Sequence, residues 1–508
     1  MQLPPVHLAI MQPAGYLHAQ GFLDQVRYFR YQFRRMGAEV TIGKNRLRED
    51  SVNMVFGAHV GFEPELLRRH ACMFVNLEQL GQGGASISAE YLKLLRSSVV
   101  VDYSAENLAS YAQDPADVPI VPFLYAPYLD DGQSLPLEQR PIDLLFFGSM
   151  NPRRQAWISR VEAAGVQVAT FDHPIFGPER DHFVRQSKAV LNCHHYESSR
   201  FEQARAFHCM SLGTPVISER TAATQAPPEY ADSVFWLEAT DVPLFFSQAF
   251  GTPEYFAAAR RKLEAFKAHD PIEAYADLLA FAASFHQAWG RTHSVAPWVP
   301  RLVNLGSGKD YKPGWLNIDV LARAEPDIVL DLGRAQSFPM EVAGCRGGTV
   351  RLEADSLEMV YANNVLEHVP DLPMLMGNAL ALLKEGGEFR IEVPYERACT
   401  AWQDPTHLRA LNENSWLYYT DWFWYLGWFE HRFDLTEFQW LDKDLRRCEQ
   451  PQAAFMRVAL RKRATTPRER SAARTLRADF GGIPDDLPVF AASENCALES
   501  AAAQGIES

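Results

Sequence analysis

Short apolar runs alternate with helical patterns along the first half of the chain. The clearest helical pattern is an amphipathic stretch from Phe22 to Met36. A polar loop at residues 128–141 interrupts the alternation, which then restarts. Apolar strands separated by helices are typical of parallel sheets covered by helices, so we expect two α/β units in series. The runs expected to form strands are residues 6–11, 40–42, 52–57, 73–77, 98–103, 142–148, 166–171, 188–193, 214–218 and 233–237.

A third α/β run follows these two units. Helical periodicity covers residues 253–289, and the polar, proline-containing segment after it is typical of a linker. Beyond the third run, weak apolar periodicity indicates a mostly flexible tail with room for one helix. The expected segments are residues 1–135 and 136–290 for the first two units, 291–300 for the linker, 301–463 for the third unit and 464–508 for the tail.

Size, charge and cysteine usage narrow the class of protein. A chain of 508 residues is too long for one hydrophobic core. A net charge of -14 argues against nucleic-acid binding, which needs a basic surface. The seven cysteines are scattered, which favours free thiols in a reducing compartment. We find no signal peptide, and the most apolar segment, residues 416–429, is short and carries Asp421. We therefore expect a cytoplasmic protein without a membrane segment.

The stretch VNLGSGKDYKPGWLNID opens the third unit in the way that a nucleotide pocket opens. Gly306 and Gly308 let the backbone turn tightly after a strand and approach a ligand. Asp319 ends the next strand, where a carboxylate can accept hydrogen bonds from both hydroxyls of a ribose. The connection between the two strands, residues 309–315, is too short for a crossover helix. This argues against a pyrophosphate cofactor such as NAD or FAD.

From residue 301 onwards, the order of the motifs VNLGSG, GWLNID, VLEHV and GGEFRIEVP resembles class I S-adenosylmethionine-dependent methyltransferases. The resemblance implies that the glycine turn lies against the methionine part of the cofactor, that Asp319 holds the ribose and that Asp331 lies near the adenine. Asn304 stands where that class often has an acid. The cofactor-binding candidates are Asn304, Gly306, Ser307, Gly308, Asp319, Asp331 and Asn363.

Two histidines are candidates for the catalytic base of methyl transfer to a hydroxyl. His407 lies in QDPTHLRALNENSW, a segment that also resembles this group, and an imidazole is well matched to proton transfer at pH 7. The alternative is a structural histidine bonded to Asp404 or to backbone. His368, in VLEHV, is the second candidate, and its alternative role is packing at a strand end. The aromatic stripe at residues 416–428 either stacks on sugar rings or belongs to the core or an inter-domain contact.

The second α/β unit carries groups suited to a diphosphate. The stretch FFGSMNPRRQAWI places a glycine, a serine and two arginines at a helix start, where amide donors and guanidinium groups favour anions. Glu202 and Arg205 share one face of a later helix. The alternatives are a solvated helix start for the arginines and an i,i+3 ion pair for Glu202 and Arg205. The donor-binding candidates are Gly148, Ser149, Arg153, Arg154, Glu202 and Arg205.

The first unit offers Gly15 and Glu78, both near strand ends, as candidates on the acceptor side. Together the motifs NLEQL, DYSAENL, FFGSMNPRR and GTPVISE resemble nucleotide-sugar-dependent glycosyltransferases of the GT-B fold, particularly a bacterial group. The resemblance implies that the second unit binds the nucleotide sugar and that Glu202 takes part in catalysis. His208 stands where the common pattern has a glutamate. Because this fold breaks down its donor with positive groups on the leaving phosphates, we expect no metal.

We therefore expect a bifunctional enzyme with a GT-B glycosyltransferase followed by a methyltransferase of Rossmann-like α/β fold. The simplest hypothesis is that one half adds a sugar from a nucleotide-sugar co-substrate and the other O-methylates the glycan with S-adenosylmethionine, in polysaccharide assembly or protein glycosylation. Fusion would raise the effective concentration of the second site. One alternative is a methyltransferase with a non-catalytic glycan-binding module, and another is a protein methyltransferase with a docking module. The oligomeric state stays open.

Overall fold

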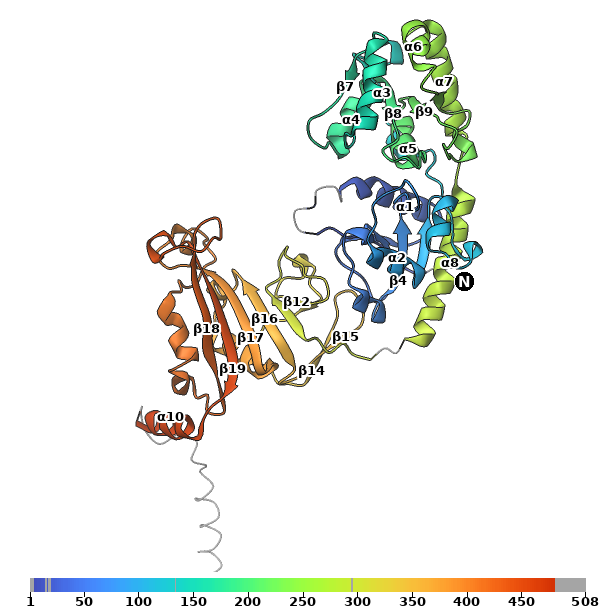
Figure 1. Cartoon of the computed structure of the whole chain (residues 1–508). Helices are drawn as coiled ribbons and strands as arrows, with labels where there is room; N and C mark the ends of the chain where they lie inside the picture. The colour runs from blue at the N-terminus through green and yellow to red at the C-terminus, as the bar shows by residue number, and fades with distance from the viewer. Residues whose placement is uncertain (1–3, 14–15, 17–19, 133, 294–295, 480–508) are drawn as a thin grey trace, which may run out of the picture. The chain divides into compact units, whose positions relative to one another are not determined.

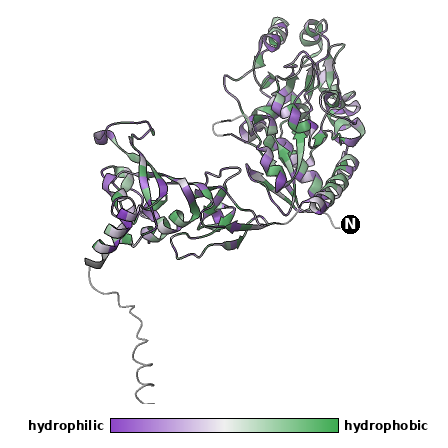
Figure 2. Ribbon diagram, turned by 60° about the horizontal axis from the view of Figure 1, so that its bottom comes forward, coloured by the Kyte–Doolittle hydropathy of each residue, from purple (hydrophilic) through white to green (hydrophobic). Residues whose placement is uncertain are grey.

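The computed structural model describes residues 4–13, 16, 20–132, 134–293 and 296–479. The chain divides into two compact units, residues 1–295 and 296–508, and each is described by itself (Figure 1). In both units the hydrophobic residues gather in the strands and on the helix faces that cover them (Figure 2). Among the described residues, no helix combines the length and apolar character needed to cross a membrane.

The first half of unit 1 is a parallel five-stranded sheet in the order β2-β1-β3-β4-β5. Four of its strands are buried on both faces, which is typical of a sheet covered by helices on either side. Each strand overlaps an apolar run from which it was expected. The strands are β1 (Val6–Ile10), β2 (Val40–Lys44), β3 (Val52–Phe56), β4 (Ala71–Asn76) and β5 (Val99–Asp102), and the helices are α1 (Phe22–Arg35) and α2 (Ala89–Arg96).

The second half of unit 1 is another parallel five-stranded sheet, in the order β10-β9-β8-β6-β7. Numbered from its own first strand, this is the same 2-1-3-4-5 order as in the first half. Its strands are β6 (Ile142–Leu145), β7 (Val168–Ala169), β8 (Ser187–Asn192), β9 (Val216–Glu219) and β10 (Phe235–Leu237). Its helices are α3 (Pro152–Ala163), α4 (Gly177–Arg185), α5 (Gln203–Ser211), α6 (Val242–Leu244) and α7 (Pro253–Lys267).

The last helix of unit 1, α8 (Ile272–Thr292), crosses back to the first sheet (Figure 1). Its Tyr275 is fully buried, and its ring makes edge contacts with Phe29 and Tyr28 of α1 at centroid distances of 5.2 and 5.7 Å. The Tyr275 hydroxyl donates to the carbonyl oxygen of Pro122 at 3.3 Å. One hydrophobic core therefore runs through both halves of unit 1.

Unit 2 is built on a seven-stranded sheet in the order β13-β12-β11-β16-β17-β19-β18. The first five strands in this row are parallel, in the Rossmann order 3-2-1-4-5, and β19 runs antiparallel to both neighbours. A two-stranded hairpin, β14-β15, lies apart from the sheet. The strands are β11 (Leu302–Leu305), β12 (Leu316–Asp319), β13 (Ile328–Val329), β14 (Met340–Ala343), β15 (Thr349–Leu352), β16 (Leu357–Asn363), β17 (Leu383–Pro394), β18 (His431–Leu441) and β19 (Phe455–Ala464), and the helices are α9 (Leu372–Leu382) and α10 (Pro467–Asp479).

The order in which successive strands are added to the sheet reverses at β11, because β12 and β13 lie on one side of β11 and the later strands lie on the other. In open α/β sheets, ligands bind at the carboxyl ends of the strands beside such a point. No described helix joins β11 to β12, as the sequence predicted. The expected α/β fold, with two Rossmann-like halves followed by a Rossmann-like third domain, is confirmed.

Candidate functional sites

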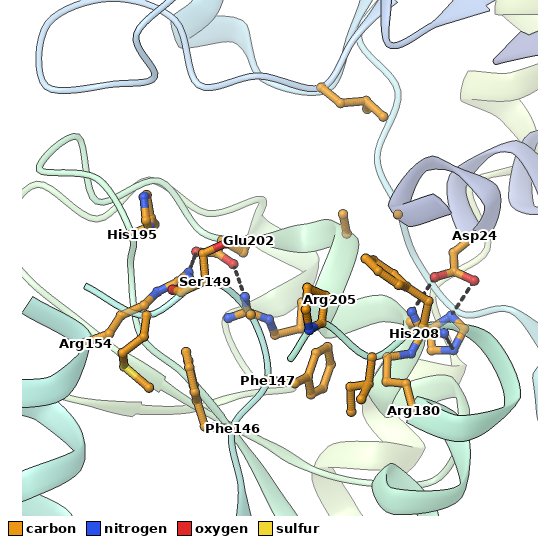
Figure 3. Close-up of a pocket in the computed structure, with 18 of the residues that line it drawn as sticks. Asp24, Phe146, Phe147, Ser149, Arg154, Arg180, His195, Glu202, Arg205 and His208 are labelled. Atoms are coloured by element: carbon orange, nitrogen blue, oxygen red, sulfur yellow. Dashed lines mark hydrogen bonds and ion pairs between the residues drawn. The ribbon is translucent and has the colours of Figure 1, made fainter. Parts of the chain in front are cut away.

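A cavity of about 570 Å³ lies in unit 1, and both halves line it (Figure 3). The first half contributes Asp24 of α1 and the segment Leu77–Gln79 that follows β4. The second half contributes Phe146–Met150 after β6 and a group of residues on and before α5. These segments follow the carboxyl ends of parallel strands, so both sheets deliver their ligand-binding edges to one cavity.

Arg154, Glu202 and Arg205 form a charged network in this cavity (Figure 3). The Glu202 carboxylate accepts from Arg154 through one oxygen and pairs with Arg205 through the other at 2.8 Å. Burial opposes ionisation of Glu202, but the guanidinium groups of Arg205 and Arg154 outweigh it and lower its pKa. Burial also lowers the pKa of Arg154, against the attraction of Glu202. The Glu202–Arg205 contact is the i,i+3 ion pair that the sequence left as an alternative.

Gly148 brings the backbone close to these arginines. Its φ is +129°, a region that side chains rarely adopt. A Cβ built on Gly148 would lie 2.8 Å from an Nη atom of Arg205 and 3.4 Å from an Nη atom of Arg154. The backbone carbonyl of Ser149 accepts from Arg154 at 2.8 Å. The glycine therefore makes room for two guanidinium groups beside the start of α3, where anions are favoured.

A second charged network in the cavity was missed from the sequence. Arg180 of α4 donates to Asp24 at 2.5 Å and to Asp181 at 2.6 Å, and Asp181 also lies 2.8 Å from Nε2 of His208. His208 and Arg180 outweigh the effect of burial and lower the pKa of Asp181 to about 2. The sequence did contain a signal that these charged side chains point inward. Asp24 lies four residues before Tyr28, and Arg180 lies four residues before Val184, so each charge shares a helix face with a fully buried side chain.

The other candidates in unit 1 have different surroundings. Arg153 does not line the cavity, because its guanidinium pairs with the buried Glu219 of β9 and donates to the His194 carbonyl oxygen at 3.0 Å. Glu78 lines the cavity and lies 3.3 Å from Nε2 of His59. Gly15 lies outside the described residues.

In unit 2, the glycine turn after β11 has the expected backbone. Gly306 and Gly308 have φ values of +62° and +48°. A Cβ on Gly306 would lie only 2.4 Å from Cγ2 of Val365, whereas a Cβ on Gly308 would meet only the Gly306 carbonyl oxygen, at 3.9 Å. Packing against Val365 therefore favours glycine at position 306 in addition to its backbone conformation, whereas at position 308 only the backbone conformation does.

Asp319 and Ser307 have hydrogen-bonding capacity to spare at this turn. The Asp319 oxygens accept from the backbone amides of Gly308 and Leu321 at 2.9 and 2.8 Å, which leaves further lone pairs on each. Ser307 is 3% exposed, and its hydroxyl has no hydrogen-bond partner among the described residues. A carboxylate with free lone pairs beside an unpartnered buried hydroxyl fits the ribose and methionine parts of an adenosyl cofactor.

Three further cofactor candidates are engaged locally. The Asn304 side-chain amide donates to the Asp310 carbonyl oxygen at 2.7 Å and to Oδ1 of Asn317 at 3.0 Å. These bonds connect β11 to the end of the glycine turn and to β12. Asp331 accepts from the Gly333 amide at 2.9 Å and closes the turn after β13. Asn363 ends β16 and accepts from the Asn364 side chain at 3.0 Å.

Glu367 and His368, just after β16, form an acid–imidazole cluster with His407, which lies in the loop after β17. Glu367 is 2% exposed, and neither carboxylate oxygen has a hydrogen-bond partner within the described part of the chain. Burial raises the pKa of this carboxyl. Nε2 of His407 lies 3.9 Å from Oε1 of Glu367, and the two imidazole rings meet edge to face with 4.7 Å between centroids. The sequence singled out both histidines and missed Glu367, although it precedes His368 in VLEHV.

The His407 ring is held by backbone, because Nδ1 donates to the carbonyl oxygen of Ala401 at 2.8 Å. This matches the part of the structural alternative that invoked backbone, and it leaves Nε2 facing Glu367. The aromatic stripe after this loop is divided between core and surface. Trp416, Tyr419 and Phe423 are buried, whereas Tyr418 and Trp422 are 41% and 45% exposed.

Comparison with known proteins identifies the C-terminal region. Residues 301–445 match a family model described as a methyltransferase domain. Uncharacterized protein L140 of Acanthamoeba polyphaga mimivirus is 30% identical over 168 residues, which are 32% of this chain and 49% of the viral protein. The chain thus spans about half the length of this curated relative. Residues 301–445 are a methyltransferase domain.

Several solved structures resemble part of the chain. An S-adenosylmethionine-dependent methyltransferase from Mesorhizobium loti is 18% identical, with a TM-score of 0.22, and the match covers 34% of this chain and 96% of that one. AviGT4, a glycosyltransferase involved in avilamycin A biosynthesis, is 15% identical, with a TM-score of 0.35, over 55% of this chain and 98% of that one. A glycosyltransferase from Rickettsia africae is 7% identical, with a TM-score of 0.36, over 57% of this chain and 100% of that one.

Proposed function

We propose that this protein is a bifunctional glycan-modifying enzyme. Unit 2 transfers a methyl group from S-adenosylmethionine to a sugar hydroxyl, and unit 1 transfers a glycosyl group from a nucleotide sugar. The observation that carries the methyl-transfer proposal is the glycine turn with Asp319 and Ser307 at the switch point of a methyltransferase domain. The glycosyl-transfer proposal is supported by two like-ordered sheets that share an arginine-lined cavity.

In unit 2 the cofactor would supply an electrophilic methyl group beside the glycine turn. The acceptor hydroxyl oxygen would form the new O–C bond as the S–C bond broke, and the acid–imidazole cluster would be the place where the hydroxyl proton is taken up. Such in-line transfer depends on positioning the hydroxyl and on a group that accepts its proton. Because the cluster and the glycine turn both follow central strands, they can act on one acceptor.

In unit 1 the two arginines beside Gly148 would hold the leaving diphosphate. Guanidinium groups bind phosphate oxygens through paired hydrogen bonds, and the start of α3 adds favourable electrostatics. Glu202 keeps both side chains in place through its two ion pairs. Departure of a nucleoside diphosphate is favoured by these positive groups, since they stabilise the charge that develops on the leaving oxygen.

A specific observation favours the alternative of a non-catalytic module in unit 1. Arg154 and Arg205 are already neutralised in part by Glu202, and His208 lies 2.8 Å from Asp181, so these charged groups of the cavity pair with one another. A module of this kind would hold glycan without releasing nucleoside diphosphate.

The two proposals are separated by one mass-spectrometric screen. Wild type, Glu202→Ala and Asp319→Ala are incubated with nucleotide sugars and glycan acceptors, with and without S-adenosylmethionine. We expect nucleoside diphosphate release to be lost only in the Glu202 variant and methylated product to be lost only in the Asp319 variant. Methyl transfer with no turnover of any nucleotide sugar would support the binding module. Methyl transfer that survives Asp319→Ala would contradict the proposed cofactor site.

A further inference from the structure

The acid–imidazole cluster contains a buried charge with no hydrogen bond. Both oxygens of Glu367 lack a hydrogen-bond partner in the described part of the chain, although a buried carboxylate is costly unless it is paired. Within the described part of the chain, the ion pair found for this carboxylate is the one with His407, whose Nε2 lies 3.9 Å from Oε1. Buried charges in proteins are either closely paired or coordinate metals, and a contact of 3.9 Å is too long to pair this carboxylate by a hydrogen bond.

The two imidazoles are oriented as metal-binding histidines are. Nδ1 of His407 donates to the carbonyl oxygen of Ala401 at 2.8 Å. Nδ1 of His368 lies 3.2 Å from the Thr406 carbonyl oxygen and 3.0 Å from the Thr406 hydroxyl, which itself donates to Asp404 at 2.7 Å. In metal sites, the ring nitrogen that does not bind the ion usually donates to a backbone carbonyl or a carboxylate, which fixes the tautomer and the ring orientation.

We propose that Glu367, His368 and His407 bind one divalent first-row transition-metal ion. The potential ligand atoms all lie within 4.8 Å of one another. Two ligands at about 2.1 Å from one zinc ion are at most about 4.2 Å apart. The 3.9 Å between Nε2 of His407 and Oε1 of Glu367 already meets this condition, and a small shift of one ring closes the rest.

The ligand types select the class of metal. Two imidazoles and one carboxylate suit Zn²⁺ or Mn²⁺, whereas Mg²⁺ and Ca²⁺ prefer oxygen ligands throughout. Three protein ligands leave open coordination positions, as in catalytic metal sites. In a sugar, two neighbouring hydroxyl oxygens can fill such positions, and a bound divalent ion favours loss of a hydroxyl proton. The role in catalysis rests on the proposed methyl transfer, but the metal site itself does not.

Unit 2 contains a matched control for the cluster. Nε2 of His431, on β18, lies 3.9 Å from Oε2 of Glu385, the same separation as in the cluster. This pair is exposed, with side chains 39% and 61% accessible, and both groups can be solvated without a metal. His431→Gln therefore removes a histidine–glutamate pair of equal spacing outside the proposed site.

The test measures metal binding to the full-length protein without cofactor or acceptor. Chelator-treated wild type, Glu367→Gln, His368→Gln, His407→Gln and His431→Gln are titrated calorimetrically with Zn²⁺, Mn²⁺ and Mg²⁺, and bound Mn²⁺ is counted by electron paramagnetic resonance. We expect one Zn²⁺ or Mn²⁺ per chain in wild type and in the His431 variant. The three cluster variants should bind at least about 100-fold more weakly, and Mg²⁺ should bind weakly throughout.

Each outcome has a defined meaning. Equal Zn²⁺ and Mn²⁺ binding by wild type and by the cluster variants overturns the proposal, and so does an equal loss in the His431 variant. If Glu367→Gln fails to fold, which circular dichroism would show, His368→Gln at a half-buried position decides the question. Metal binding without methyl transfer would contradict the proposed function and leave the site standing. Methyl transfer that survives both chelation and Glu367→Gln would contradict a catalytic role for the metal and leave the proposed methyl transfer standing.

Discussion

Gly306 and Gly308 form a matched pair for separating packing from backbone conformation. Both residues have φ in the left-handed region, so alanine at either position costs about 1–2 kcal/mol in backbone strain. Only Gly306→Ala also drives a methyl group to 2.4 Å from Cγ2 of Val365, and overpacking of this kind adds about 1–3 kcal/mol. We therefore expect losses in unfolding free energy of about 1–2 kcal/mol for Gly308→Ala and about 2–5 kcal/mol for Gly306→Ala.

Urea unfolding followed by tryptophan fluorescence measures these losses, because most of the eleven tryptophans lie in unit 2. Val365→Ala removes the methyl groups that the new Cβ would meet, so the double variant Gly306→Ala/Val365→Ala tests the packing component in a double-mutant cycle. We expect a favourable coupling of about 1–3 kcal/mol between the two substitutions. A coupling near zero would refute the conclusion that packing requires a glycine at position 306. Equal losses of unfolding free energy in Gly306→Ala and Gly308→Ala would refute it as well.

Three further predictions concern single side chains. Ser307→Ala should change the unfolding free energy by less than about 0.5 kcal/mol, because the hydroxyl has no protein partner to lose. The same substitution should weaken S-adenosylmethionine binding about fivefold. An unchanged affinity in calorimetry would contradict this prediction. Glu202→Gln should cost about 3 kcal/mol in urea unfolding followed by circular dichroism, since it leaves two guanidinium groups without their carboxylate, and a loss below about 1 kcal/mol would contradict it. The pKa of Asp181 is lowered from 3.8 to about 2 in the folded state, so its ionised form stabilises the fold by about 2 kcal/mol above pH 4, and this contribution is lost as the pH falls towards 2. The unfolding free energy of Asp181→Asn should therefore be lower than that of wild type by the full amount at pH 7, and this difference should shrink below pH 4. A difference that does not change with pH would contradict the prediction.

The strand positions of unit 1 could be predicted from sequence because the signal is local. Buried parallel strands such as Val52–Phe56 and Ala71–Asn76 are continuous apolar runs, and those runs identify them without knowledge of their neighbours. The glycine turn was equally predictable, since glycine adopts the φ values found at Gly306 and Gly308 with less strain than other residues.

The parts that could not be predicted depend on contacts between distant residues. The helical pattern near residue 275 indicates a helix, but nothing in it says that Tyr275 packs against α1. The antiparallel strands β18 and β19 carry many charges, and only Phe433 and Leu441 of β18 are buried, so these strands lack the continuous apolar run that marked the parallel strands. Glu367 and His407 are brought together only by the path of the loop after β17, which no periodicity describes.

The return of α8 to the first sheet has a consequence for synthesis of the chain. Tyr275 fills the space beside Tyr28 and Phe29, so the core of the first half stays incomplete until the ribosome has released residues far beyond that half. Domains usually fold as units from the N-terminus during translation. Here the N-terminal half cannot complete its core until the entire second sheet has been synthesised, and until then the apolar side chains that α8 covers stay exposed. The two halves of unit 1 therefore reach their final structure together, and a chain interrupted before α8 would be an aggregation-prone fragment rather than a folded domain.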